Sequence, residues 1–342
     1  MVGLVTLALG CGSDATAPTV DDPGLGDGPF QGWFIAAGEN RLVFSQDGDD
    51  WYDVDQFGES VLNLTGRSMI DVAATRTRLV LTEVNEGEIS RFQSGPDRME
   101  VRTIPSPIFA LATDQQSFLG FGRYGIYGSS DGLDFALLDT NLGFPLGGLE
   151  VNPNLVHGGG RYVTALTFRD AVLQFRMGIA TSEDGITWEA TNVWARQGFH
   201  VDLLEDEFGF VALGVRGVPD DANRVVWISP DGLTWSEQRF AGLTGPTPRT
   251  LARASSGRLV VLGGGEQGVY RWYSDDEGST WQEDQVIGGG EDAPLDMLFA
   301  EGRFLAVLES GRIATSVDGE SWTAAYPAST PGGALRSIHY VK

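Results

Sequence analysis

Cysteine is almost missing from this chain, because Cys11 is the only one among 342 residues. A single cysteine cannot form an intramolecular disulfide, so the stability of the fold must come from packing and hydrogen bonds. Basic residues are also scarce: 23 lysines and arginines stand beside 47 aspartates and glutamates, which gives a net charge of −24. That balance argues against binding to nucleic acid or to an anionic membrane surface.

The usual signatures of catalysis and of bound cofactors are missing as well. The three histidines, His157, His200 and His339, form no His-x-x-x-His zinc pair. The chain has no Gly-x-Ser-x-Gly nucleophile turn, no phosphate-binding loop and no calcium loop with D-x-D-x-D-G spacing. We therefore predict no cofactor and no metal site; structural calcium stays open, although no motif indicates it. Sustained apolar periodicity of 3.6 residues is also absent, so we expect few helices.

What the chain does contain is a short motif in which Ser-x-Asp precedes a glycine and an aromatic residue. Six copies occupy residues 45–51, 129–135, 182–188, 229–235, 274–281 and 316–322. Most of their aspartates are separated by roughly 45 residues. The gap from Asp47 to Asp131 is about twice as long, and a degenerate copy within residues 87–97 fills it. Seven such units, each with several short strands, are typical of the blades of a β-propeller.

The motif resembles the Asp-box, or BNR repeat, of sialidase-like β-propellers. The resemblance implies that the aspartate accepts hydrogen bonds from its own turn, the glycine takes a positive φ, and the indole fills the gap between neighbouring sheets. A catalytic acid or a calcium ligand is the other interpretation, but a catalytic group is needed once and a structural one in every blade. The structural role is assigned to Asp47, Trp51, Asp131, Asp184, Trp188, Asp231, Trp235, Asp276, Trp281, Asp318 and Trp322.

The ends of the chain predict how the ring of blades closes. Residues 335–341 match the innermost strand of other units, such as residues 295–299, whereas the first unit starts near Trp33 and lacks that strand. We therefore expect an all-β fold over residues 31–342, a seven-bladed β-propeller in which the C-terminal strand completes the first blade. Closure of this kind removes an open sheet edge. Six or eight blades fit the spacing less well.

The N-terminal segment carries a targeting signal. Residues 2–10 are apolar and too short to span a bilayer, and Cys11 follows them directly. This segment resembles a bacterial lipobox, although position −3 is Ala8 rather than leucine and no basic residue precedes the apolar run. We expect residues 1–11 to be a lipoprotein signal peptide with Cys11 as the lipidation site, and residues 12–30 to be a disordered tether. An ordinary cysteine in a short leader is the alternative.

Location and activity follow from these two resemblances. The lipobox implies an outer-membrane lipoprotein in the cell envelope of a Gram-negative bacterium, or a secreted protein. Sialidases carry an arginine triad, a Tyr–Glu pair, an acid/base aspartate and an F/Y-R-I-P motif; the nearest match here, residues 101–105, has Thr103 inserted. We expect a monomeric, non-enzymatic binding or assembly propeller, as in photosystem assembly factors and sorting receptors, with a protein or glycan partner. A sialidase-like glycoside hydrolase or lyase is the alternative.

Two groups of residues are candidates for ligand binding. Aligning the innermost strands places one residue of each at a channel mouth, on the face opposite the motif turns: Asp71, Phe109, Glu150, Asp202, Arg249, Asp296 and Arg336. Alternatively, this ring only solvates the channel and pairs internally. The second group lies on or between long loops of the fourth and fifth units: Phe168, Arg169, Trp194, Arg196 and Arg216. Aromatic and arginine side chains are enriched at binding surfaces, but local packing of a longer hairpin explains them equally well.

Overall fold

The computed structural model describes residues 30–53, 69–83, 87–93, 99–104, 106–138, 149–172, 174–194, 196–216, 223–240, 246–265, 268–288, 292–326 and 334–342. The leader, Cys11, the tether before Phe30 and the end of the degenerate motif copy, residues 94–97, lie outside these ranges. Every regular element within them is a β-strand, which confirms the predicted all-β class.

Five sheets have four antiparallel strands each. The first sheet contains β28 (Leu335–Tyr340), β1 (Phe34–Gly38), β2 (Arg41–Ser45) and β3 (Tyr52–Asp53). The second contains β4 (Met69–Ala74), β5 (Arg78–Glu83), β6 (Glu88–Gln93) and β7 (Met99–Thr103). The third contains β8 (Ile108–Thr113), β9 (Phe118–Gly122), β10 (Gly125–Ser129) and β11 (Ala136–Leu137). The other two are β20 (Pro248–Arg253), β21 (Leu259–Gly265), β22 (Gly268–Ser274) and β23 (Gln282–Gly288); β24 (Pro294–Ala300), β25 (Arg303–Leu308), β26 (Ile313–Ser316) and β27 (Thr323–Tyr326).

The sixth sheet has eight strands. It holds β12 (Leu149–Gly158), β13 (Arg161–Arg169), β14 (Phe175–Ser182), β15 (Glu189–Ala190), β16 (Arg196–Asp206), β17 (Gly209–Arg216), β18 (Asn223–Ser229) and β19 (Ser236–Arg239). Two four-stranded groups meet in this sheet, because β14 pairs with β15 and also, through Arg176 and Met177, with the start of β16. The strands β13, β14, β16 and β17 are long enough to make this second contact.

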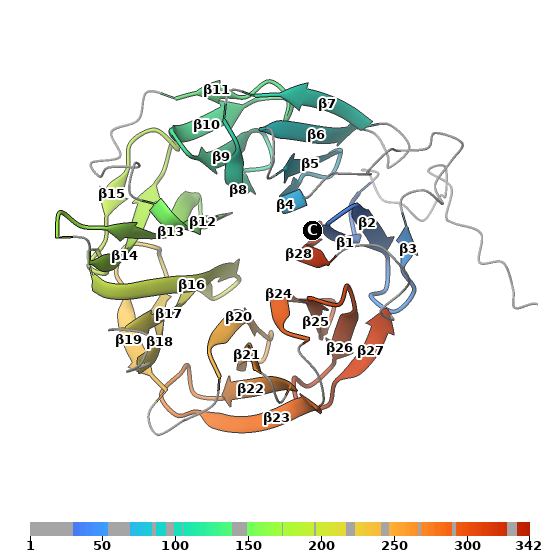
Figure 1. Ribbon diagram of the computed structural model, residues 1–342, viewed down its shortest axis with the longest axis vertical. Helices are drawn as coiled ribbons and strands as arrows, with labels where there is room; N and C mark the ends of the chain where they lie inside the picture. The colour runs from blue at the N-terminus through green and yellow to red at the C-terminus, as the bar shows by residue number, and fades with distance from the viewer. Residues whose placement is uncertain are drawn as a thin grey trace, which may run out of the picture.

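The sheets are arranged around a central axis (Figure 1), and the strands β4, β8, β12, β16, β20, β24 and β28 lie nearest to it. Each of these innermost strands contacts the next innermost strand along the chain. The C-terminal strand β28 pairs with β1 as predicted, and it contacts both β4 and β24. One sheet therefore contains strands from near both ends of the chain.

The apolar core of the described residues is divided into seven clusters, and each cluster joins two neighbouring groups of strands. One of them combines Phe34 and Val43 of the first sheet with Leu305 and Ile313 of the last. The strands β1 and β25 are apolar along nearly their whole length, because both faces of each sheet are covered by a neighbour. Burial between stacked sheets, rather than one central core, stabilises the fold.

The six copies of the motif form turns of one kind, which we call the Ser-x-Asp turns. In the turn at Asp184, the carboxylate Oδ1 accepts hydrogen bonds from the N–H groups of Ile186 and Thr187 at 2.8 and 2.6 Å. The Ser182 hydroxyl accepts the Gly185 N–H at 2.9 Å, and the Trp188 indole donates to the Gly185 carbonyl at 3.0 Å. The glycine has φ between 72° and 81° in all six turns, which a residue with a Cβ adopts only with strain.

The serine and aspartate bonds recur at Asp47, Asp131, Asp231, Asp276 and Asp318, and the indole bond recurs at Trp51, Trp235, Trp281 and Trp322. The turn at Asp131 has Phe135 in place of tryptophan, so it lacks the indole bond. Each of these aspartates therefore satisfies the backbone of its own turn.

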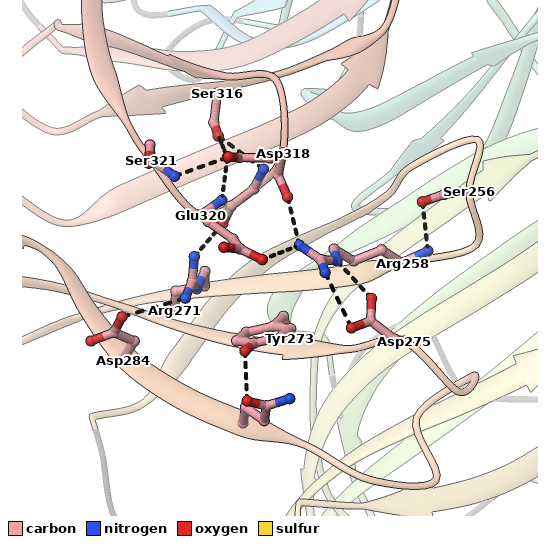
Figure 2. A network of polar contacts seen from close by, with 12 residues as sticks. Ser256, Arg258, Arg271, Tyr273, Asp275, Asp284, Ser316, Asp318, Glu320 and Ser321 are labelled. Atoms are coloured by element: carbon pink, nitrogen blue, oxygen red, sulfur yellow. Dashed lines mark hydrogen bonds and ion pairs between the residues drawn. The ribbon is translucent and has the colours of Figure 1, made fainter.

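Arginines on one sheet reach the Ser-x-Asp turn of the next. Figure 2 shows Arg258, just before β21, between Asp275 at 2.6 Å and Glu320 at 2.6 Å, while it also donates to the Asp318 carbonyl at 2.9 Å. Arg271 of β22 donates to the Gly319 carbonyl at 2.8 Å. The same kind of contact joins the last sheet to the first, because Arg303 forms an ion pair with Asp49 at 2.7 Å. Polar contacts thus add to the apolar packing between sheets.

Candidate functional site in the central channel

A channel of about 830 Å³ follows the central axis and is lined by the innermost strands. We call the end at which these strands begin the bulge end, and the end at which they finish the turn end. Because successive strands of a sheet run in opposite directions, the Ser-x-Asp turns lie on the same face as the turn end. The two ends carry different residues and are described in turn.

At the bulge end, a β-bulge near the start of six innermost strands shifts the strand register by one residue. The residues skipped by the bulge are Ile70, Phe109, Val201, Arg249, Leu295 and Arg336, and all of them line the channel. The residues that follow are Asp71, Ala110, Asp202, Thr250, Asp296 and Ser337. The predicted single column is therefore wrong: Phe109, Arg249 and Arg336 stand one position before the three aspartates.

The three aspartates join neighbouring sheets. Each carboxylate accepts the N–H of the next residue on its own strand and a second N–H from the innermost strand of the following sheet. Asp71 accepts from Leu111 at 2.7 Å, Asp202 from Leu251 at 2.9 Å and Asp296 from Ile338 at 2.8 Å. Asp202 also accepts the Thr250 hydroxyl at 2.9 Å. Both oxygens of each carboxylate are thus engaged in holding neighbouring innermost strands together.

Burial in the channel wall raises the pKa values of these aspartates. The pKa of Asp71 rises to about 7, and the pKa of Asp202 is also raised by burial. Burial and the nearby charge of Asp202 place the pKa of Asp296 well above its ordinary range. The Ser-x-Asp turns do the opposite: hydrogen bonds from Thr187 and Ile186 lower the pKa of Asp184 to about 2. Folding therefore shifts the pKa values of the two sets of aspartates in opposite directions.

We expect the free energy of unfolding to be largest near about pH 4 to 5. Aspartates with a lowered folded pKa, such as Asp184, stabilise the fold above an ordinary pKa of about 4 and lose that contribution as the pH falls towards 2. Buried acids with a raised folded pKa, such as Asp71, stabilise it below about pH 4 and lose that contribution as the pH rises through about 7. Urea unfolding at pH 3 to 8 measures the curve, and stability that climbs steadily from pH 4 to pH 8 would contradict it.

The remaining bulge-end residues form an apolar mouth with two arginines. Ile70, Phe109, Val201 and Leu295 are partly exposed to the channel. Arg249 forms an ion pair with Glu309 at 3.4 Å, and Arg336 forms one with Glu39. Both arginines are more than two-fifths exposed, so a ligand can reach their guanidinium groups.

At the turn end, the channel is lined by titratable side chains that were not predicted as site residues from the sequence. His157 of β12 and Glu205 of β16 occupy equivalent positions, three residues beyond the bulge-end position of Asn154 and Asp202. Burial raises the pKa of Glu205 to about 7, against the opposing charge of Lys342. Burial also lowers the pKa of His339 to about 4. A sequence signal exists only for His157 and Glu205, which stand at equivalent positions of two innermost strands.

The long hairpins of the fourth and fifth units are packed against each other. Phe168 is 8% exposed and stacks on Trp194 with ring centroids 5.2 Å apart. The Arg169 guanidinium lies 4.6 Å from the Phe175 ring centroid, and Phe175 packs on Phe199 at 4.5 Å. Phe168 therefore serves local packing of the hairpin, the alternative that the sequence left open for this residue.

Other predicted residues are placed as follows. Arg216 forms an ion pair with Glu237 at 2.8 Å, and Arg196 is exposed and donates to the Asn192 carbonyl at 3.2 Å. Glu150 lies in β12, but its side chain is outside the described part of the structure. Arg102, in the imperfect sialidase-like motif, lies in the outermost strand β7 and pairs with Asp134. It stands far from the channel-lining strands.

Among the described residues, no three His, Cys, Asp or Glu side chains are grouped so that they could hold a metal ion. The described part of the chain also contains no apolar helix of the length needed to cross a bilayer.

No protein-family model matches the chain, and no curated protein matches its sequence. Solved structures match its fold. YCF48 bound to D1 peptide aligns with a TM-score of 0.53 and 16% identity, over 75% of this chain and 82% of that one. The Dos1 propeller aligns with a TM-score of 0.55 and 12% identity over 79% and 72%, and the WD40 propeller domain of Doa1 with 0.55 and 15% over 81% and 87%. The chain therefore has a β-propeller fold.

Proposed function

We propose that this protein is a binding or assembly propeller with seven blades, closed by β28. Counting β12–β15 and β16–β19 as separate blades gives seven groups of strands, in line with the seven apolar clusters between them. The contacts of β28 with β4 and β24 support closure. A regular ring of this kind offers a fixed surface at the mouth of its channel, which is where we place the binding site.

The partner in this proposal is a segment of another protein that binds at the bulge end. The observation that carries it is the bulge itself, which places Ile70, Phe109, Val201 and Leu295 at the channel mouth, beside two accessible arginines. An apolar concave surface with a few polar groups is typical of a binding site, and aromatic and arginine residues contribute most of the energy at interfaces. The similar fold of YCF48, solved with the D1 peptide, supports a peptide as ligand.

The hairpins beside this mouth belong to the proposed surface through their exposed residues. Val172, at the tip of the β13–β14 hairpin, is 70% exposed, and Arg196 is exposed at the start of β16. Trp194 packs against the same hairpin through its stack on Phe168. Arg169 and Arg216 contribute through their guanidinium groups, which their local contacts hold in place.

Catalysis is not part of this proposal. Asp296 lines the channel as Asp71 and Asp202 do, but both of its oxygens accept main-chain N–H groups. A general acid must instead be free to exchange its proton with a substrate. A panel of fluorogenic glycosides is therefore expected to show no turnover that depends on Asp296.

The binding proposal is tested by quantitative pull-down from the native cell envelope. Phe109→Ala and Arg336→Ala are each expected to reduce partner recovery at least tenfold, because truncation of a central interface residue costs about 2 kcal/mol or more. Leu137→Ala is the matched control, since Leu137 is 56% exposed on the outermost strand β11, away from the channel. Equal recovery with all three variants would place the binding site elsewhere.

We also propose that the Ser-x-Asp turns are Asp-boxes and that the chain is an envelope lipoprotein anchored through Cys11. The cysteine directly after an apolar leader supports lipidation. The change Cys11→Ser is expected to release the protein from the membrane fraction and to abolish labelling by a palmitate analogue. Unchanged fractionation and labelling would disprove the anchor while leaving the binding proposal intact.

A further inference from the structure

The turn end of the channel contains polar groups that the fold itself does not use. The Glu205 carboxyl lines the channel and makes no hydrogen bond or ion pair with the described residues. The ring nitrogens of His157 likewise have no hydrogen-bond partner there, although its ring packs on Tyr162 at 4.5 Å. This differs from the bulge end, where main-chain N–H groups saturate the aspartates.

The nearest cations do not neutralise Glu205. Arg253 occupies the equivalent position on the next innermost strand, but its guanidinium binds Asp206, with Nε 2.7 Å from the carboxylate, and lies over the Phe208 ring at 5.0 Å. Lys342 is close enough for its charge to act on Glu205, yet it forms no ion pair with Glu205. A half-buried carboxylate without an ion-pair partner is unfavourable, and a bound cation would relieve it.

The surroundings of Glu205 in the channel suit a cationic group. Gly158 on the neighbouring innermost strand packs directly against the Glu205 side chain, which occupies the space that a Cβ at Gly158 would need. Phe299 and Tyr340 line the channel at the same level on other strands, and aromatic rings attract guanidinium and ammonium groups. The carboxylates of the Ser-x-Asp turns surround this face, and their field attracts cations from solution.

We propose that the turn end of the channel is a second binding site, which takes up a basic side chain of a partner protein. An arginine or lysine enters the channel along its axis, and its charged group pairs with Glu205 between the aromatic rings. This site is at the opposite end of the channel from the proposed bulge-end surface and does not depend on it.

The test uses a probe with one positive charge, N-acetyl-Gly-Arg-Gly-amide, and its citrulline counterpart, titrated by calorimetry against the intact propeller. The arginine peptide is expected to bind and the citrulline peptide to bind at least tenfold more weakly. Glu205→Gln should weaken the arginine peptide at least tenfold. Glu207→Gln is the matched control, because Glu207 is two residues away in the turn after β16, exposed and outside the channel lining. It should change the affinity less than twofold.

A second variant separates the site from the general negative charge of the protein. Lys342→Ala removes a cation whose charge acts on Glu205 and is expected to tighten binding of the arginine peptide several-fold. The proposal is overturned if the wild-type protein does not distinguish the two peptides, or if Glu205→Gln and Glu207→Gln weaken binding equally. Far-UV circular dichroism and melting of each variant confirm that the ring is folded.

Discussion

Removal of residues 335–342 is expected to abolish cooperative folding of the protein. The deletion takes away β28, whose Leu335 and Ile338 are buried in the cluster that joins the first and last sheets. It also leaves one edge of β1 unpaired and removes the N–H group that Asp296 accepts. The lost contacts are comparable with the whole net stability of a domain, about 5–15 kcal/mol, so no folded ring should remain. Thermal unfolding followed by circular dichroism measures the effect.

Removal of Lys342 alone is the control for this deletion, because the strand that pairs with β1 ends before it. That shorter protein should melt as the wild type does. A protein without residues 335–342 that kept the wild-type melting temperature would show that β28 is dispensable, and the inference of a ring closed by this strand would fail with it.

Trp235→Ala is expected to destabilise the protein by about 3–5 kcal/mol. Trp235 is 4% exposed and packs between the fourth and fifth units, in a cluster with Val163 and Phe210. Its N–H and carbonyl are also held by the side chain of Asn192, at 3.0 and 2.9 Å, from the neighbouring unit. Loss of the indole leaves a cavity between these two groups of strands, and the cavity cannot collapse without moving both groups. Urea unfolding gives the change in free energy.

The same turn provides the control for Trp235. Leu233 is 39% exposed, and Leu233→Ala should change stability by no more than about 0.5 kcal/mol. Trp235→Phe separates packing from hydrogen bonding, because it keeps an aromatic ring but loses the indole bond to the Gly232 carbonyl at 3.2 Å. A loss of stability for Trp235→Ala as small as that for Leu233→Ala would mean that packing of the indole between the two units does not stabilise the fold.

Most of the architecture could be predicted from the sequence because it is local and repeated. Each Ser-x-Asp turn is fixed by bonds between residues no more than four positions apart, such as that from Thr280 to Asp276. A pattern of that range survives in one sequence read alone. The unit between Asp47 and Asp131 was predicted from the degenerate copy within residues 87–97, and β4–β7 form a sheet there.

The site could be predicted less well, because it depends on features that leave no trace in residue type. A β-bulge adds one residue to a strand without any characteristic amino acid, so Arg249 and Asp296 were aligned although they stand one position apart. Partnering between distant residues is equally hidden. The stack of Phe168 on Trp194 and the lack of a partner for Glu205 in the described part of the chain both require the third dimension.

The pairing of β1 also determines how the propeller responds to mechanical force. A force applied along β1 is resisted on both sides, because β1 is hydrogen-bonded to β2 on one side and to β28 on the other. The Gly32 N–H adds a bond to the Val341 carbonyl at 2.7 Å, close to the point where the force enters. Two strand ladders loaded in shear must break together, whereas a strand at a free edge can be peeled off one bond at a time. The blade nearest to any N-terminal attachment is therefore built to bear load.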